Sequence, residues 1–157
     1  MKKITFILLI SITLISCQKE PSSFVNFSGK ISNTKKTDTV FSIKSKEYSK
    51  DIKINTNGTF KDTLHIKEVG YYTLVMNNRN YGFVFLRNGF DLKLTADYNS
   101  FFQTTKYSGE GANTTNYLLD QYKFNLALGN TNKLFVLEKE EFKNELNNIK
   151  NAYDSLR

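Results

Sequence analysis

Apolar and polar residues alternate along the chain from residue 24 to about residue 107, with many aromatic and β-branched residues among them. Within this stretch Phe60, Leu64 and Ile66 would share one face of an extended strand. Turn-forming Gly and Asn residues recur about every 8–12 positions, a spacing typical of an antiparallel sandwich or barrel. We therefore predict about eight strands, over residues 24–31, 39–44, 51–55, 59–67, 71–76, 82–87, 91–95 and 103–107.

Two of these strands carry patterns that predict their place in a sheet. Residues 83–86 are apolar on both faces, which favours a central strand. Residues 91–94 read Asp, Leu, Lys, Leu, which fits a strand with one exposed face. Between strands, Asn57-Gly58, Asn77-Asn78 and Asn88-Gly89 supply residues that tolerate positive φ in tight turns.

After Gly109 a helical period replaces the alternation. Residues 112–128 carry Leu118, Tyr122 and Leu126 at spacings of four, and Gly129 follows as a stop signal. The predicted fold is therefore mainly β: an antiparallel β-sandwich of about eight strands followed by two C-terminal α-helices.

The second of these helices is predicted from about Leu137. Glu138, Glu140 and Glu141 fall in its first turn, where the helix dipole favours carboxylates. Its apolar residues form one stripe, made of Phe142, Leu146, Ile149, Tyr153 and Leu156. The stripe still continues at the last residue, which leaves two interpretations: a C-terminal helix that frays, or the front part of a longer protein.

The start of the chain has the three parts of an export signal. Lys2 and Lys3 are positively charged, and residues 4–15 are apolar over a length too short to span a bilayer as a lone helix. Leu14-Ile15-Ser16-Cys17 then resembles the lipobox of bacterial lipoproteins, in which the cysteine thiol takes a diacylglyceryl group. We predict a lipoprotein signal peptide over 1–16 and lipidation of Cys17; the alternative is a buried cysteine at the end of an apolar helix.

Charge and cysteine content exclude several classes of function. The formal net charge is +7, and loss of Lys2 and Lys3 with the signal peptide lowers it to about +5. The charges are scattered without a basic run or recognition helix, so nucleic acid is not expected as a partner. Cys17 is the only cysteine. The mature chain therefore has no internal disulfide, no Cys-x-x-Cys pair and no thiolate nucleophile.

The order of several short motifs resembles the DUF4369 family, an N-terminal β-sandwich domain of Bacteroidetes lipoproteins. These motifs are Phe27-Ser28-Gly29-Lys30-Ile31, Asn57-Gly58-Thr59-Phe60, Gly70-Tyr71-Tyr72-Thr73-Leu74, Leu86-Arg87-Asn88-Gly89-Phe90-Asp91-Leu92-Lys93-Leu94, Tyr107-Ser108-Gly109-Glu110-Gly111-Ala112 and Asn116-Tyr117-Leu118. In that family the sandwich precedes a thioredoxin-like domain of TlpA/ResA-like thiol-disulfide oxidoreductases. The resemblance covers about residues 24–157, and the thioredoxin-like domain with its Cys-x-x-Cys is absent.

This resemblance implies a division of the chain and a function. The expected parts are the signal peptide 1–16, a lipidated tether 17–23, a DUF4369-like sandwich 24–109 and a helical segment 110–157 that links to a missing thioredoxin-like domain. The chain would be the non-catalytic N-terminal module of an oxidoreductase, with no cofactor or metal of its own. The alternative is a free-standing envelope lipoprotein whose sandwich binds a glycan, a peptide or a partner protein.

The resemblance and the lipobox also imply a location and partners. Lipid on Cys17 would hold the chain in the cell envelope. Gln18 stands where an aspartate marks inner-membrane retention in some bacteria, which favours the periplasmic face of the outer membrane. The expected partners are the membrane and either a C-terminal thioredoxin-like domain or another envelope protein.

Several residues suggest chemistry and have a simpler interpretation beside it. Gly109-Glu110-Gly111 lies between a strand and a helix, but Thr114 replaces the third glycine of a dinucleotide fingerprint, so a turn is expected. His65 is the only histidine and falls on a polar strand face, which favours a solvated side chain over a catalytic or zinc-binding one. Candidate carboxylate pairs come from Asp51, Asp62, Asp91 and Asp97.

Two further features concern the surface. Tyrosines often line sugar-binding or partner surfaces, and the candidates here are Tyr48, Tyr71, Tyr72, Tyr81 and Tyr98. The tripeptides at 38–40, 62–64 and 154–156 resemble Asp-Ser/Thr-aliphatic O-glycosylation sites of exported Bacteroidetes proteins, which predicts modification of Thr39, Thr63 or Ser155. An intact-mass measurement on native material tests that prediction.

Overall fold

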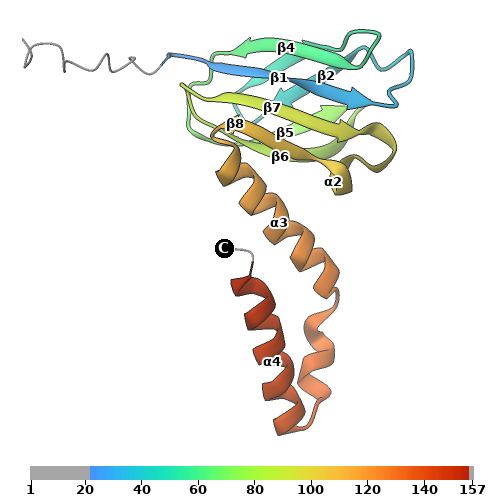
Figure 1. Cartoon of the computed structure of the whole chain (residues 1–157), viewed down its shortest axis with the longest axis vertical. Helices are drawn as coiled ribbons and strands as arrows, with labels where there is room; N and C mark the ends of the chain where they lie inside the picture. The colour runs from blue at the N-terminus through green and yellow to red at the C-terminus, as the bar shows by residue number, and fades with distance from the viewer. Residues whose placement is uncertain (1–21, 156–157) are drawn as a thin grey trace, which may run out of the picture.

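Eight strands form two four-stranded sheets that pack face to face, and the helices follow at the C-terminal end (Figure 1). The computed structural model describes residues 22–155. The first sheet has the order β4-β1-β7-β8 and the second has the order β3-β2-β5-β6. The predicted mainly β fold with C-terminal helices is confirmed. The strands are β1 (Val25–Ser32), β2 (Val40–Lys44), β3 (Ser49–Lys53), β4 (Thr59–Leu64), β5 (Gly70–Met76), β6 (Arg79–Leu86), β7 (Asp91–Asp97) and β8 (Lys106–Glu110).

One strand pair departs from the antiparallel pattern. Strands β1 and β7 run parallel, with Asn26 opposite Asp91 and Ser32 opposite Asp97, whereas the other five pairs of the described sheets are antiparallel. Parallel neighbours need a long connection, and here the chain passes through the whole second sheet between these two strands.

The core lies between the two sheets. Phe27 of β1, Phe41 of β2 and Phe60 of β4 meet at its centre, with ring centroids 4.9 to 6.4 Å apart. Every buried apolar residue of the described chain falls between Val25 and Leu134. A protein that begins at residue 18 therefore keeps the complete described core and is expected to fold without the segment before it.

Strand β6 is an edge strand, so the prediction that residues 83–86 form a central strand is wrong. Its second apolar face is covered by neighbouring aromatic rings instead of by further strands. The ring of Phe83 lies 6.4 Å from Tyr71 and 5.9 Å from Tyr122, and Phe85 lies 5.4 Å from Tyr71. A strand that is apolar on both faces can thus stand at an edge when a helix covers one face.

Side chains form hydrogen bonds with backbone groups on the free edge of β6. The Tyr107 hydroxyl of β8 donates to the Phe83 carbonyl at 3.0 Å. The Phe85 N–H donates to the Thr115 hydroxyl at 3.2 Å, and that hydroxyl lies 3.4 Å from the Phe85 carbonyl. Both side chains are buried. Tyr107 joins the edges of the two sheets, Thr115 reaches β6 from the helix that follows β8, and together they leave this part of β6 unavailable for pairing with another chain.

Burial raises the pKa of the Tyr107 hydroxyl far above its ordinary value of 10.0. The folded state therefore holds this proton more tightly than the unfolded state does. The resulting stabilisation is complete below about pH 10 and is lost as the pH rises above that value, because only the unfolded chain then gives up the proton readily.

We expect Tyr107→Phe to lower the free energy of unfolding by about 1 kcal/mol at neutral pH, because the Phe83 carbonyl loses its donor. Above pH 10 the Tyr107 hydroxyl loses its proton in the unfolded chain only, which lowers the free energy of unfolding of the wild type by about 1.4 kcal/mol per pH unit. The variant lacks this hydroxyl and does not show that decrease. The two stability curves should therefore cross near pH 11 in a series of urea titrations. A gap that stays constant with pH would contradict the assignment.

The segment before β8 differs from the prediction of a strand over 103–107. A short 3-10 helix η2 (Tyr98–Ser100) and a helical turn α2 (Phe101–Thr104) precede β8 there. The Asp97 carboxylate accepts from the Asn99 N–H and starts this helical stretch. Phe101 is buried with its ring 5.3 Å from Tyr81. The predicted strand therefore overlaps β8 only at Lys106 and Tyr107.

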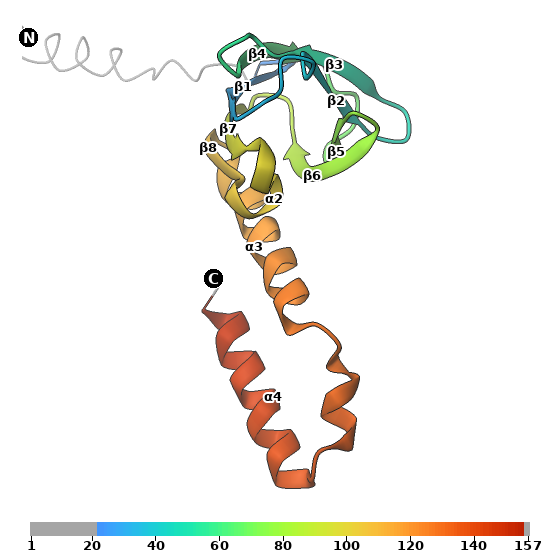
Figure 2. The same cartoon turned by 90° about the vertical axis from the view of Figure 1, so that its right-hand side faces the viewer.

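Helix α3 spans Ala112–Leu128, as predicted, but it buries a different face. The buried residues are Ala112, Thr115 and Leu119, whereas Tyr122 is 49% exposed and Leu126 is 58% exposed. The first three turns of the helix contact the sandwich, through Ala112, Thr115, Leu119 and the ring of Tyr122, and the C-terminal part projects away from it (Figures 1 and 2).

The remaining helices fold back beside α3. A 3-10 helix η3 (Thr131–Val136) leads into α4 (Lys139–Asp154), which begins close to the predicted position. The predicted stripe of α4 is only partly covered: the Tyr153 ring lies 5.8 Å from Phe124, the Phe142 ring lies 6.3 Å from Phe135, and α4 contains no buried residue. Leu156 lies outside the described residues. We call α3, η3 and α4 together the helical arm (Figure 2).

Candidate functional site

Cys17, the predicted lipidation residue, lies outside the described residues, as do the signal peptide 1–16 and most of the tether 17–23. The described chain begins at Ser22 and enters β1, which lies between β4 and β7 in the first sheet. None of the described helices is long and apolar enough to cross a membrane. The structure therefore leaves lipidation of Cys17 as a prediction from the sequence.

Lysine and hydroxyl residues alternate over the outer face of the first sheet. The strand register sets two adjacent rows of four residues side by side across β4, β1, β7 and β8. One row is Lys61, Ser28, Lys93 and Ser108, and the next is Thr59, Lys30, Thr95 and Lys106. We call these eight residues the lysine face. This face is not visible in the sequence, because the pattern exists only once the strands are in register.

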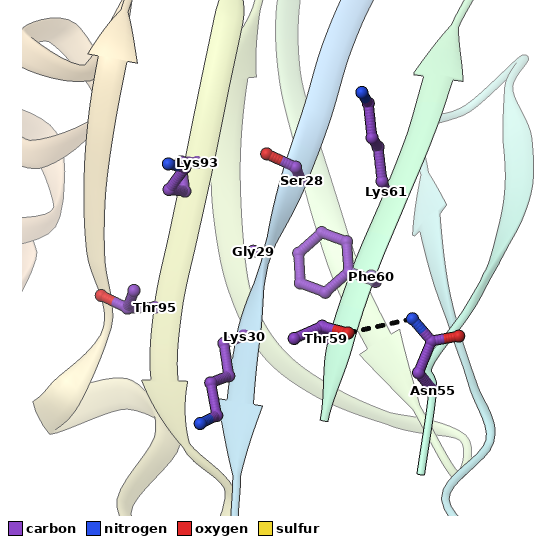
Figure 3. Close-up of a pocket in the computed structure, with 9 residues that line it drawn as sticks. All are labelled: Ser28, Gly29, Lys30, Asn55, Thr59, Phe60, Lys61, Lys93 and Thr95. Carbon is purple, nitrogen blue, oxygen red and sulfur yellow. Dashed lines mark hydrogen bonds between the residues drawn. The ribbon is translucent and has the colours of Figure 1, made fainter. Parts of the chain in front are cut away.

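A shallow hollow of about 360 Å³ lies in the lysine face (Figure 3). Gly29 and the ring of Phe60 lie at its floor, between the polar residues of the neighbouring strands. Asn55 donates to the Thr59 hydroxyl at 2.9 Å on one side. The remaining lining residues are Ser28, Lys30, Lys61, Lys93 and Thr95, so no carboxylate lines the hollow.

The four lysines of this face have no carboxylate partner. The ion pairs within residues 22–155 are Lys50 with Asp62 at 3.4 Å and Lys143 with Glu140 at 2.9 Å. The acidic residues of the same sheet face lie beyond the two rows. Asp91 and Glu110 are paired at one end, and Asp97 lies at the other. The positive charge is therefore concentrated in the middle of the face.

A second hollow, of about 330 Å³, lies between the outer face of β5 and β6 and helix α3. It has aromatic walls and two amide side chains, and it contains no charged residue. Tyr71 and Tyr122 are both about half exposed there. The lining residues are Tyr71, Phe83, Leu118, Gln121, Tyr122 and Asn125. We call it the aromatic hollow.

The five candidate tyrosines do not form one surface. Tyr48 and Tyr72 pack against each other with ring centroids 5.5 Å apart, and burial raises the pKa of both. Tyr81 and Tyr98 form a second pair at 5.8 Å, and their hydrogen bond raises the pKa of Tyr81. Only Tyr71 lines the aromatic hollow.

Tyr122 joins Tyr71 there, although its helical spacing had suggested a packed stripe. The exposed side of α3 could not be read from the sequence, because Leu118, Leu119, Tyr122 and Leu126 allow two apolar faces. The choice between them depends on which face fits the edge of β6.

The candidate carboxylates are separated and have local structural roles. Asp51 accepts from the Ser42 hydroxyl at 2.6 Å, Asp62 pairs with Lys50, and Asp97 caps η2. Asp91 lies opposite Glu110 in the β7–β8 ladder. Residues 22–155 contain no group of three or more His, Cys, Asp or Glu side chains placed to hold a metal ion.

His65 and the glycine pair near residue 110 have structural surroundings too. His65 is exposed, and its ring lies 5.9 Å from Phe24. Gly109 lies within the antiparallel β7–β8 ladder, opposite Leu92, and Gly111 caps α3 with a φ of 92°. A dinucleotide site would need a parallel βαβ unit at this point. The arrangement here is a turn that opens a helix.

Asp38, the first residue of one predicted glycosylation tripeptide, is buried. Its carboxylate accepts from the Lys35 N–H at 3.0 Å and from the Asn77 amide at 2.7 Å. It thereby ties the β1–β2 loop to the β5–β6 turn. The neighbouring Thr39 is exposed, Thr63 is half-buried within β4, and Leu156 of the third tripeptide lies outside the described residues.

Comparison of the chain with models of protein families, with curated proteins and with solved structures gives no match. The function proposed below therefore rests on the sequence and on the geometry of this chain.

Proposed function

We propose that this chain is a membrane-tethered, non-catalytic scaffold, the N-terminal module of a TlpA/ResA-like thiol-disulfide oxidoreductase. Lipid on Cys17 would anchor it to the outer membrane at the periplasmic face. The sandwich would act as a spacer, and the helical arm would dock the thioredoxin-like domain. Thiol exchange needs a Cys-x-x-Cys pair, so it would take place on that second domain.

The observation that carries this proposal is the exposed apolar surface of the helical arm. Phe135 is 78% exposed and Val136 is 84% exposed, and Leu126 and Leu146 are exposed as well. Such residues are costly to leave in water and are typical of surfaces that bind another protein or domain. They lie on the arm that projects from the sandwich (Figure 2).

Site-specific photo-cross-linking in the native cell tests the docking role. A photoreactive residue at Phe135 is expected to label a thioredoxin-like domain that carries Cys-x-x-Cys, either in the same polypeptide or in a second one. The matched control is the same residue at Glu47, which is exposed on the sandwich. Equal labelling at the two positions, or labelling only of proteins without that motif, would count against the proposal.

Lipid attachment is tested separately. Cys17→Ser is expected to abolish incorporation of a palmitate analogue and to move the protein from the membrane fraction to the soluble fraction. Ser16→Ala keeps a small residue before the cysteine and should behave as the wild type. A Cys17→Ser protein that still carries label would show that Cys17 is not the acceptor.

The aromatic hollow favours a second candidate function, binding of a neutral glycan by a free-standing lipoprotein. Tyr71 and Tyr122 offer ring faces for a sugar, and Asn125 offers an amide group for its hydroxyls. A neutral glucose oligosaccharide should shift the NMR signals of these residues in the wild type but not in Tyr71→Ala. Signals that do not move with a panel of neutral oligosaccharides would remove this candidate.

A further inference from the structure

We propose that the lysine face is a docking surface for an anionic phospholipid bilayer and holds the sandwich flat against the membrane. This inference depends on the proposed function for one element only, the lipid tether at Cys17. The binding itself is a property of the described sandwich and can be measured without the lipid.

The arrangement of donors carries the proposal. Successive residues of a row lie about 5 Å apart across the strands, and the two rows lie about 7 Å apart along them. Within this lattice each lysine has a serine or threonine directly opposite it on the neighbouring strands. Like charges directly opposite one another would destabilise the sheet, and the alternation avoids this. The positive charge is spread evenly over an area instead of gathering at one point.

Such a lattice suits a flat array of anions better than a single one. In Figure 3 the side chains of Lys61 and Lys30 extend toward opposite ends of the hollow, so they do not converge on one position. Ammonium groups and hydroxyls both donate hydrogen bonds to phosphate oxygens. The face thus presents two kinds of phosphate ligand over four strands, with charge complementary to phosphate headgroups.

The surroundings of the face define its edges. Asp91 and Glu110 at one end and Asp97 at the other lie outside the two rows. These carboxylates would be repelled by an anionic surface, so contact is confined to the lysine and hydroxyl positions. No large apolar residue belongs to the eight positions. The attachment is therefore electrostatic, without insertion of a wedge into the acyl region, and sensitive to salt.

The proposed tether brings the face to the membrane. Residues 18–24 span at most about 25 Å when fully extended, so a lipid at Cys17 keeps β1 close to the headgroups. Tethering raises the local concentration of the two surfaces, and weak contacts then suffice to fix an orientation. Docking would leave the helical arm free to meet a partner.

The test uses the unlipidated protein that begins at Gln18, which retains the complete described core. Its binding is measured by co-sedimentation with vesicles of pure phosphatidylcholine and with vesicles that contain phosphatidylglycerol. Each lysine near an anionic surface contributes about a fivefold gain in partitioning. We expect Lys30→Gln, Lys61→Gln, Lys93→Gln and Lys106→Gln together to lower binding to the anionic vesicles by about 100-fold or more.

The matched control removes the same charge elsewhere, with Lys44→Gln, Lys46→Gln, Lys53→Gln and Lys67→Gln, all at exposed positions. It should retain most of the binding, and thermal unfolding followed by circular dichroism checks that both variants fold. Equal losses in the two variants would show attraction by net charge alone and overturn the proposal. So would binding to phosphatidylcholine that matches the binding to anionic vesicles.

A further binding measurement distinguishes an anionic membrane from other polyanions as the ligand of the lysine face. Binding to polygalacturonate without binding to anionic vesicles would reassign the lysine face to an acidic polysaccharide and overturn the bilayer assignment. Failure of Cys17 lipidation in the cell would leave the vesicle result untouched, and loss of vesicle binding would leave the photo-cross-linking result untouched. The two proposals therefore fail independently.

Discussion

Gly29→Val is expected to destabilise the sandwich by more than about 4 kcal/mol, a large fraction of the stability of an ordinary domain. Gly29 lies on β1, between β4 and β7, at a position where the strand faces the core. A Cβ atom there would lie 2.1 Å from the Leu94 carbonyl oxygen and 2.7 Å from the ring of Phe60. The first of these is backbone of a paired strand, which cannot move aside without breaking the parallel β1–β7 ladder.

The matched control for Gly29→Val is Ser28→Val, one residue away on the opposite, outer face. It introduces the same side chain into the same strand, but at a half-buried position of the lysine face. Its free energy of unfolding should stay within about 0.5 kcal/mol of the wild type in urea titrations. A similar loss in both variants would mean that valine disturbs the strand itself, and the close packing at Gly29 would not be the cause.

The steric role of Gly29 shows what the sequence could and could not predict. The alternation from residue 24 onward correctly predicted β1 to β7 and the buried face of Phe60, Leu64 and Ile66, because a strand buries every second side chain regardless of its neighbours. The Asn77-Asn78 turn was also predictable from the local sequence, because Asn tolerates positive φ. The two residues adopt φ values of 49° and 59° within a two-residue hairpin loop. Such features are local.

Features that depend on contacts between distant segments were not predictable. Whether β6 is central or at an edge depends on Tyr107 and Thr115, which reach it from β8 and α3. The parallel pairing of β1 with β7 and the lattice of lysines depend on a register between strands about 65 residues apart. A single sequence contains the residues for these contacts but does not state which of them meet.

Phe60→Ala is the second substitution with a large expected effect, a loss of about 3–5 kcal/mol in the free energy of unfolding. The ring of Phe60 is buried and lies 5.3 Å from Phe27 and 4.9 Å from Phe41, so it connects the two sheets at the centre of the core. It also fills the space that Gly29 leaves empty. Its removal would open a cavity that the rigid strands around it cannot close.

Phe135→Ala is the matched control, because it removes the same ring from a position on the helical arm that is 78% exposed. It should change the free energy of unfolding by no more than about 0.5 kcal/mol. Urea titrations of both variants make the comparison. If Phe60→Ala costs no more than Phe135→Ala, the packing of the three phenylalanines does not hold the two sheets together.

The double variant Gly29→Ala with Phe60→Ala separates the two contacts at this point of the core. If the Phe60 ring were the main obstacle to a side chain at Gly29, its removal would lower the cost of Gly29→Ala by more than about 1 kcal/mol. The Leu94 carbonyl is closer and belongs to the β7 backbone, which Phe60→Ala leaves in place. We therefore expect the cost of Gly29→Ala to be the same in both backgrounds within about 0.5 kcal/mol. That result would identify the close approach of β1 and β7 as the reason for a glycine in this strand.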